Sequence, residues 1–155
     1  MKFLIIGSYN AVTYKEVFPL IKDNKMWLGC NFVKEFKTPD GGIKKFGNVV
    51  WYTNLPHKKR NEELILFRDY HGHEEDYPIY DNYNAIEVSK VVNIPRDYDG
   101  VMGVPISFLD KHNPKQFEIL GLCSQLVKET TGKVDRFYIN GNRMFARIVI
   151  KRRTK

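Results

Sequence analysis

The sequence predicts an α/β fold followed by a small antiparallel β lobe. In the first third of the chain, continuous apolar strands alternate with a short helical segment, which is typical of a parallel sheet covered by helices. Near the C-terminus, two β-rich segments flank Asn140-Gly141, a strong hairpin signal. We therefore expect one domain over residues 1–155, with residues 1–67 forming a partial α/β core and residues 68–155 forming the antiparallel lobe.

The first strand and helix are predicted from apolar patterning and a capping signal. Phe3–Ile6 is a continuous apolar run ended by Gly7, which indicates a strand buried on both faces of a parallel sheet. Thr13 and Glu16 have the capping-box spacing, so we expect a helix to begin there. Pro19 lies inside that helix and predicts a kink or a restart.

Two further strands follow in the first half. Met26–Val33 is apolar and predicts the second strand, and Gly41-Gly42 marks a turn. The segment 48–55 is rich in β-forming residues and ends at Pro56, which predicts the third strand. Three strands are few for a doubly wound sheet, and no glycine-rich turn follows the first of them. The α/β pattern is therefore truncated.

The second half predicts short strands around an acidic loop. The expected elements are a strand at Leu64–Phe67, a loop at Tyr70–Tyr83, a strand at Ala85–Val88, a short helix from Pro105 to Lys111 and a segment at Phe117–Leu122, for which strand is favoured over helix. The final hairpin pairs Asp135–Ile139 with Arg143–Lys151, and its alternation places arginines on one face.

Length and composition exclude several classes of protein. The 155 residues suffice for one domain, and an apolar share of 43% excludes an intrinsically disordered chain. No apolar run approaches the ~18 residues of a membrane-spanning helix, and the N-terminal run is too short for a signal peptide. Cys30 and Cys123 cannot form a disulfide framework or a four-cysteine zinc site. We expect a cytoplasmic protein with no membrane partner.

The positive charge of the chain is unevenly distributed. The formal net charge is +7, yet six acidic residues and no lysine or arginine lie between Asp69 and Glu87, so the rest is more basic still. A basic surface with interleaved aromatic rings suits a nucleic acid. The basic residues predicted to contact a nucleic acid are Lys58, Lys59, Arg60, Arg143, Arg147, Arg152 and Arg153. The alternative is that such clusters, including the terminal run that ends at Lys155, are solvated surface.

No complete catalytic motif is found in the sequence. The chain has no nucleophile elbow, no Walker sequence and no Gly-x-Gly-x-x-Gly motif, and Cys30 lies in an apolar strand. His71 and His73 precede three acidic residues and could ligate a metal ion, but a solvated acidic loop is the favoured interpretation. We therefore predict no metal site and no catalytic residue.

Two segments carry candidate binding residues. Ser8-Tyr9-Asn10 follows the first strand, and ligands of open α/β sheets bind at the carboxyl ends of strands. Trp51 and Tyr52 are adjacent in a strand, so their rings point to opposite faces, and one can project while the other is buried. The alternatives are that the first segment only caps a helix and that both rings are packed.

Several long strings of the sequence together resemble one family. They are the segments 2–7, 10–21, 47–55, 77–83 and 97–110, with Asn140-Gly141 and Ala146-Arg147. In these strings the chain resembles the EcoRI-type adenine-specific DNA methyltransferases over essentially its whole length. The resemblance implies a Rossmann-like methyltransferase sheet, S-adenosylmethionine as methyl donor and double-stranded DNA as substrate.

The resemblance also implies that half of the enzyme is missing from this chain. Family members are about twice as long, and their donor-binding loop and Asn-Pro-Pro-Phe motif lie upstream of the segment that matches Lys2. The only Asn-Pro here, Asn113-Pro114, is followed by Lys115. We expect a carboxyl-terminal half that is inactive alone, does not bind S-adenosylmethionine alone, and pairs with the missing half or with itself through the edge of its first strand.

By position in the family, the strand at residues 48–54 forms a wall of the pocket for the extruded adenine. The candidate pocket residues are Tyr9, Asn10, Asn48, Trp51, Tyr52 and Asn54. The function class left open beside the methyltransferase half is a non-catalytic DNA-binding module or an interaction subunit.

Overall fold

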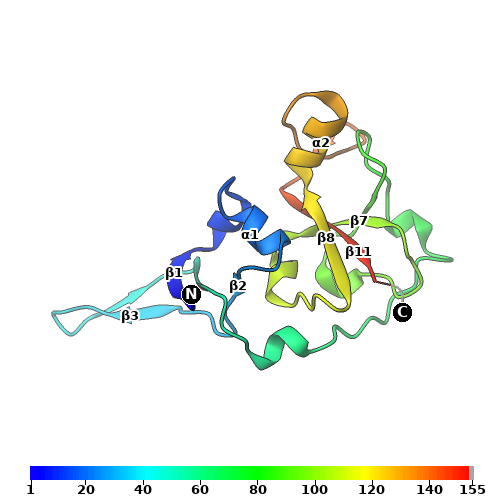
Figure 1. Ribbon diagram of the computed structural model, residues 1–155. Coiled ribbons are helices and arrows are strands. Elements are labelled where there is room, and N and C mark those ends of the chain that lie inside the picture. Colours follow the sequence, from blue (N-terminus) through cyan, green and yellow to red (C-terminus); the bar gives the residue numbers. More distant parts are fainter. Residues whose placement is uncertain (154–155) are drawn as a thin grey trace. The chain divides into compact units, whose positions relative to one another are not determined.

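The computed structural model describes residues 1–153 and divides into two compact units (Figure 1). One unit comprises Met1–Arg60 and the other Asn61–Lys155, so the boundary falls before the position expected from the sequence. Each unit contains its own sheet. Residues Thr154 and Lys155 lie outside the described part of the chain.

A three-stranded sheet forms the centre of the first unit. Its strands are β1 (Leu4–Ser8), β5 (Val49–Thr53) and β2 (Trp27–Leu28), in the order β1-β5-β2. β5 pairs antiparallel with both neighbours, so β1 and β2 run parallel to each other. The strands at the start of the chain and at residues 48–55 are confirmed, but their direct pairing is antiparallel, which corrects the expected parallel sheet.

One face of this sheet is covered and the edge strand β1 is not. Val50, Tyr52 and Leu28 of the covered face are buried, as are Val12, Phe18 and Ile21 of the helical segments. In β1, by contrast, Leu4 and Ile5 are each 55% exposed. The prediction that this strand is buried on both faces is wrong for this structure, because within residues 1–153 it pairs only with β5 and its consecutive side chains, which point to opposite faces, are exposed.

The helical segments between β1 and β2 are shorter than predicted. A 3-10 helix spans η1 (Tyr9–Thr13), and the α-helix α1 (Phe18–Lys22) follows it. The predicted capping box at Thr13 is wrong, because the Thr13 hydroxyl donates to the carbonyl of Asn10. Pro19 lies in the first turn of α1 and so starts the helix instead of kinking it, since a first-turn residue needs no amide donor.

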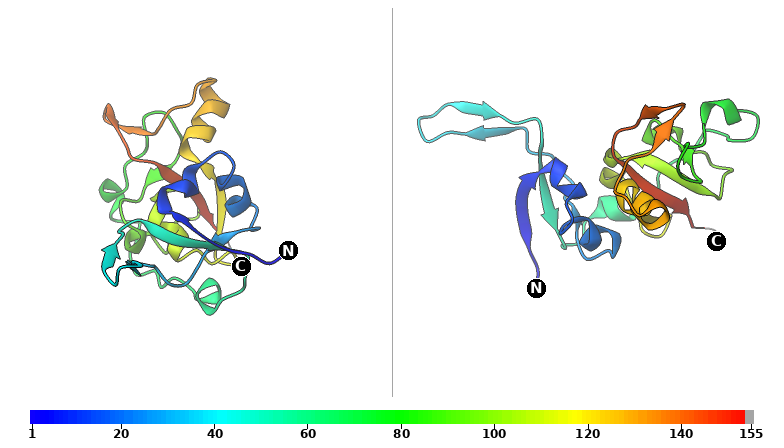
Figure 2. Two further views of the ribbon diagram at one scale, coloured as in Figure 1. Left: turned by 90° about the vertical axis from the view of Figure 1, so that its left-hand side faces the viewer. Right: turned by 90° about the horizontal axis from the view of Figure 1, so that it is seen from above.

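A β-hairpin projects from the first unit between β2 and β5 (Figure 2). It consists of β3 (Glu35–Lys37) and β4 (Ile43–Lys45), joined by a turn in which Gly41 has φ of 87°. The turn at Gly41-Gly42 was predicted, whereas the two short polar strands were not. The predicted strand Met26–Val33 is reduced to β2, since the backbone leaves the sheet after Gly29. The unit ends in the 3-10 helix η2 (Lys58–Asn61).

The second unit is built on a four-stranded sheet with the order β6-β7-β11-β8. These strands are β6 (Ile86–Glu87), β7 (Val101–Pro105), β11 (Arg147–Arg152) and β8 (Phe117–Leu122). β11 pairs antiparallel with β7 and β8, while β6 and β7 are parallel. The antiparallel character of this part is therefore confirmed for three of the four strands.

A helix and a hairpin complete this unit (Figure 1). The helix α2 (Cys123–Thr131) was not predicted, and it ends where Gly132 adopts φ of 80°. The hairpin predicted at Asn140-Gly141 is present, with β9 (Tyr138–Ile139) paired to β10 (Asn142–Arg143) and positive φ at both turn positions. The predicted second strand Arg143–Lys151 is wrong in its extent, because most of it belongs to β11, which pairs with β7 and β8. One core cluster joins α2 to the sheet and consists of Tyr80, Ala85, Cys123, Val127, Phe137 and Val149.

The remaining segments of the second unit are short. The 3-10 helices are η3 (Glu74–Asp76), η4 (Val91–Asn93) and η5 (Ile106–Asp110). η5 occupies the segment predicted to be a helix after Pro105. The predicted strand at Leu64–Phe67 is wrong: it forms no strand, and only the following Arg68 makes an isolated bridge, to Pro95. This segment is held instead by the Gln116 side chain, which accepts a hydrogen bond from the Leu64 amide and donates one to the Leu64 carbonyl.

A buried ion pair joins β6 to β11. The Arg147 guanidinium donates from Nε and Nη2 to the Glu87 carboxylate at 2.8 and 3.0 Å, and Tyr80 donates its hydroxyl to the same carboxylate at 2.8 Å. Burial beside this carboxylate raises the pKa of the Tyr80 phenol. The arginine of β11 therefore points into the unit, and the interpretation of this face as an open arginine surface is wrong at Arg147.

Gly103→Ala is expected to destabilise the second unit by about 1–3 kcal/mol, because a methyl group there overpacks the ion-pair site. A Cβ at Gly103 would lie 2.1 Å from the Tyr80 hydroxyl and would displace it from Glu87. Urea denaturation followed by circular dichroism measures the cost. Gly47→Ala is the control, since a Cβ there meets nothing within 4 Å. Equal unfolding midpoints for the two variants would contradict this packing argument.

Candidate nucleic-acid interface

Three residues that were predicted from the sequence lie together where β1 ends and β5 begins. The Tyr9 amide donates to the Asn48 carbonyl at 3.0 Å. The Ser8 hydroxyl accepts from the Asn48 side-chain amide at 3.2 Å and from the Asn10 backbone amide at 3.3 Å. Tyr9, Asn10 and Asn48 thus form one hydrogen-bonded group at the carboxyl end of β1, the position at which ligands of open sheets bind.

An aromatic residue that was not predicted joins this group. Phe32 follows β2, and its ring stacks on that of Tyr9 with the centroids 6.2 Å apart and the planes 23° from parallel. Because β1 and β2 are parallel, the segments after them meet at the same edge of the sheet. Phe32 is 40% exposed, so part of its ring is open to a ligand.

The basic cluster of η2 contacts the same aromatic residues. The Lys59 ammonium lies 5.7 Å from the centre of the Phe32 ring, within cation–π range. Arg60 stacks over the Trp27 ring at 4.2 Å and donates to the Asn24 side chain. Burial lowers the pKa of Arg60 to about 10. Lys58 and Lys59 therefore remain the residues of this cluster best placed to meet a phosphate.

Trp51 and Tyr52 point to opposite faces of β5, and their environments differ. Tyr52 is buried, its hydroxyl donates to the Ser8 carbonyl at 2.6 Å, and desolvation raises its pKa to about 12. Trp51 is half-buried and packs against Gly29, where a Cβ would approach within 2.9 Å. Tyr52 is thus a core residue that supports Ser8, and Trp51 is the ring with an exposed part.

Asn54 lies at the other end of β5, away from Asn48. Its side chain donates to the Met1 carbonyl at 2.6 Å and accepts from the Phe3 amide at 2.9 Å. Both bonds fix the start of the chain against the end of β5. The structure therefore separates Asn54 from the group around Tyr9.

A largely apolar recess of about 560 Å³ lies between the end of β1 and the β3–β4 hairpin. Phe36 and Phe46 of the hairpin meet edge to face with centroids 5.3 Å apart, and the Lys44 ammonium lies 5.7 Å from the Phe46 ring. The residues that line the recess are Ile6, Gly7, Ser8, Phe36, Lys37, Thr38, Pro39, Lys44, Phe46 and Val49. It offers rings and cations next to β5, which begins directly after Asn48.

The arginines of the second unit that were predicted to contact DNA differ in how strongly their side chains are engaged by other residues of the protein. Arg143 is exposed, with Asp135 at 3.9 Å. Arg152 is engaged by the Asp99 carboxylate at 2.6 Å and by the Arg96 carbonyl, and Arg153 donates to the Pro114 carbonyl at 2.8 Å. Arg147 is held by Glu87 and is not available.

Two classes of feature are absent from the described part of the chain. Over residues 1–153, no group of three or more histidine, cysteine, aspartate or glutamate residues is arranged to hold a metal ion. Within the same residues, no helix is both long and apolar enough to cross a membrane.

Comparison with known proteins decides the family. The family model described as "Adenine-specific methyltransferase EcoRI" matches residues 1–153. The chain belongs to this family. It is 44% identical to the Escherichia coli protein named Type II methyltransferase M.EcoRI over 97% of its length. It is 33% identical to Type II methyltransferase M.MgeORF184P of Mycoplasma genitalium over 97%, and 34% identical to Type II methyltransferase M.MpnI of Mycoplasma pneumoniae over 98%.

This member of the EcoRI methylase family spans about half the length of the curated relatives it matches. The match covers 50% of the Escherichia coli protein and 57% of each Mycoplasma protein. No solved structure gives a significant match to the chain. The family resemblance read from the sequence is confirmed by these matches, and it places the chain among DNA methyltransferase relatives.

Proposed function

We propose that this chain is the DNA-binding half of an adenine-N6 DNA methyltransferase of the restriction–modification type, which uses S-adenosylmethionine as donor and acts in the cytoplasm. Membership of the EcoRI methylase family supports the reaction class. One observation supports DNA binding as the role of this half. Tyr9, Phe32 and Asn48 lie together at one edge of the sheet, where the Lys59 ammonium lies over the Phe32 ring. Exposed rings beside cations suit the extruded base and the backbone of DNA.

The residues at this edge can hold an extruded adenine. Extrusion costs a few kcal/mol, and stacking on an aromatic ring is worth ~1–3 kcal/mol per base. Phe32, with its exposed ring, and Trp51, half-buried on β5, are stacking surfaces in this unit. Asn10 is exposed, its backbone amide bonds Ser8, and its side chain can hydrogen-bond to the base. Tyr52 acts through Ser8, as a positioning residue.

The recess at the end of β1 does not fit S-adenosylmethionine. The recess at the end of β1 is lined by Lys37 and Lys44 and by no carboxylate. Its two ammonium groups would repel the sulfonium and the α-ammonium of the donor, and no acidic group is present to receive the ribose hydroxyls. We expect the isolated chain to transfer no methyl group.

The exposed edge of β1 is the proposed contact with the donor-binding half. β1 pairs with β5 on one side, and in the first unit no described strand pairs with its other side. Leu4, Ile5 and Ile6 are 55%, 55% and 41% exposed. An apolar edge strand with unpaired backbone groups favours pairing with another strand. In this proposal, β1, β5 and β2 are the end of a larger Rossmann-like sheet. Self-association through the same edge is the alternative outcome in the absence of that half.

Binding of the chain to duplex DNA tests the proposal and is expected to fall steeply between ~50 and ~200 mM salt, since phosphate contacts release counterions. Fluorescence anisotropy with a labelled duplex measures the affinity. Lys58→Ala and Lys59→Ala should each reduce the salt slope by about one. Lys22→Ala, in the last turn of α1, is the charge-matched control and should leave the slope unchanged. Flat or absent binding across this range would contradict a DNA-binding role.

A further inference from the structure

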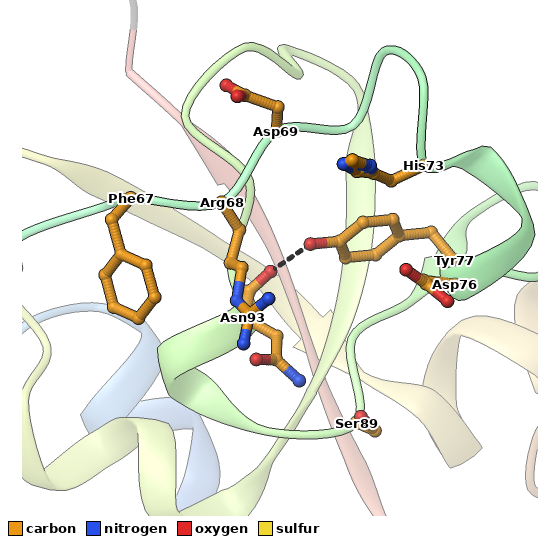
Figure 3. A pocket seen from close by; sticks show the side chains of 8 residues that line it. All are labelled: Phe67, Arg68, Asp69, His73, Asp76, Tyr77, Ser89 and Asn93. Carbon is orange, nitrogen blue, oxygen red and sulfur yellow. Dashed lines mark hydrogen bonds between the residues drawn. The ribbon is translucent and has the colours of Figure 1, made fainter.

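The second unit contains a polar pocket that the proposed adenine site does not use. It has a volume of about 360 Å³, which is room for one nucleobase. Figure 3 shows the Arg68 side chain pointing toward that of Asn93, between the rings of Phe67 and Tyr77. The residues that line the pocket are Phe67, Arg68, Asp69, His73, Asp76, Tyr77, Ser89 and Asn93.

The cation in this pocket is free to bind a ligand. Within residues 1–153, the Arg68 guanidinium has no hydrogen-bond or ion-pair partner; it lies 5.5 Å from the centre of the Phe67 ring. The neighbouring carboxylate does not neutralise it, because Asp69 accepts from Arg96 at 2.6 Å. The Asn93 side-chain amide likewise has no partner in the described chain.

The backbone on both walls of the pocket is fixed by hydrogen bonds. The Arg68 carbonyl accepts from the Arg96 amide at 2.9 Å, and Arg68 forms a bridge with Pro95. On the opposite wall, Tyr77 is buried and its hydroxyl donates to the Asn93 carbonyl at 2.6 Å. The Asp97 carboxylate accepts hydrogen bonds from the backbone amides of Tyr70 and His71, at 2.6 and 3.1 Å. A preorganised donor loses little entropy on binding.

We propose that this pocket reads a guanine of the target DNA, with the Arg68 guanidinium as the base-reading group. The inference rests on the proposed DNA-binding function and adds a specificity determinant to it. Guanine presents O6 and N7 as two adjacent acceptors, which match the paired donors of a guanidinium. The Asn93 amide supplies another donor beside it, and the exposed ring of Phe67 offers a stacking surface.

The charge around the pocket favours a base over a phosphate. Asp76 lines the pocket, and Glu74 and Glu75 precede it in η3. A phosphate bound to Arg68 would meet these carboxylates, whereas a base edge is neutral. Asp76 can also accept hydrogen bonds from the base, since guanine carries donors as well as acceptors.

Selection from a pool of duplexes with a randomised segment, using the full chain, tests the proposal. The wild-type chain is expected to enrich sequences with guanine at one position at least. Arg68→Ala should lower the preference for that guanine about tenfold or more, and Arg68→Lys should also lower it, because a lysine cannot donate bidentately. Thermal unfolding of both variants checks that the exposed substitution leaves the fold intact.

Lys90→Ala is the matched control, because it removes an exposed cation next to the lining residue Ser89. It should leave the base preference unchanged. A uniform loss of affinity for all sequences in Arg68→Ala, with Arg68→Lys rescuing it, would assign Arg68 to a phosphate and overturn the proposal. An unchanged base preference in Arg68→Ala, or binding of wild type without any preference for guanine, would overturn it too. A wild-type chain that binds no duplex would instead overturn the proposed function itself.

Discussion

Glu87→Ala and Arg147→Ala are each expected to lower the free energy of unfolding by about 3–5 kcal/mol. The side chains of Arg147 and Glu87 are only 9% and 5% exposed, and two charge-assisted hydrogen bonds join them. Removing either partner leaves a charge in the interior without compensation. In Glu87→Ala the Tyr80 hydroxyl also loses its acceptor.

A double-mutant cycle with urea denaturation measures the coupling between the two residues. The double variant should cost less than the sum of the two single variants, because it leaves no unpaired charge. The exposed pair Arg96–Asp69 is the control: its side chains are 60% and 41% exposed, and truncating it should cost 1 kcal/mol at most, a rough bound for surface pairs. Additive single effects, or equal costs for the two pairs, would contradict a buried network.

The same residues show why the sequence misassigned Arg147. Alternation along β11 correctly places alternate residues on opposite faces, but it does not say which face is buried. The partner that makes a buried arginine tolerable, Glu87, is sixty residues away in the chain. Pairing of this kind depends on the order of strands in the sheet, which periodicity does not determine.

The elements predicted correctly are those whose formation depends on residues close together in the sequence. The strand at Phe117–Leu122 and the turn at Asn140-Gly141 are present as expected, because an apolar β-rich run and an Asn-Gly pair each need only their own residues. Helix α2 was missed because it follows that strand without a loop. Its signal was present in Gly132, which ends the helix with its amide bonded to the Lys128 carbonyl at 2.8 Å.

The candidate site was predicted in part. Tyr9 and Asn10 could be placed from the rule that ligands meet the carboxyl ends of strands, and Asn48 from its place at the start of a β-rich run. Phe32 lies in an irregular segment beyond a two-residue strand, where no periodicity marks it. Its role depends on the parallel course of β1 and β2, which follows from pairing with a strand distant in the sequence.

The second large expected effect concerns methyl transfer. We expect no transfer from this chain alone and measurable transfer once a donor-binding half is added. The chain offers exposed rings and cations for DNA, and its recess at the end of β1 holds no carboxylate for the donor. In the proposed function, the missing groups belong to a donor-binding half that contacts β1.

The edge of β1 provides a matched pair of variants for this interaction. Ile5→Lys puts a charge on the exposed edge strand, which disfavours strand pairing, and should reduce association and reconstituted activity about tenfold or more, the effect of a lost contact worth ~1.4 kcal/mol. Ile65→Lys changes an isoleucine that is 82% exposed in the second unit and should leave both unchanged. Equal behaviour of the two variants would contradict the placement at β1.

The most direct measurement is transfer of labelled methyl groups from S-adenosylmethionine to adenine N6 in duplex DNA. It compares this chain alone with its mixture with the half of the Escherichia coli relative that the match does not cover. We expect no label in DNA from the chain alone and N6-methyladenine from the mixture. Transfer by the pure chain, or an inactive mixture of two folded halves that associate, would contradict this expectation.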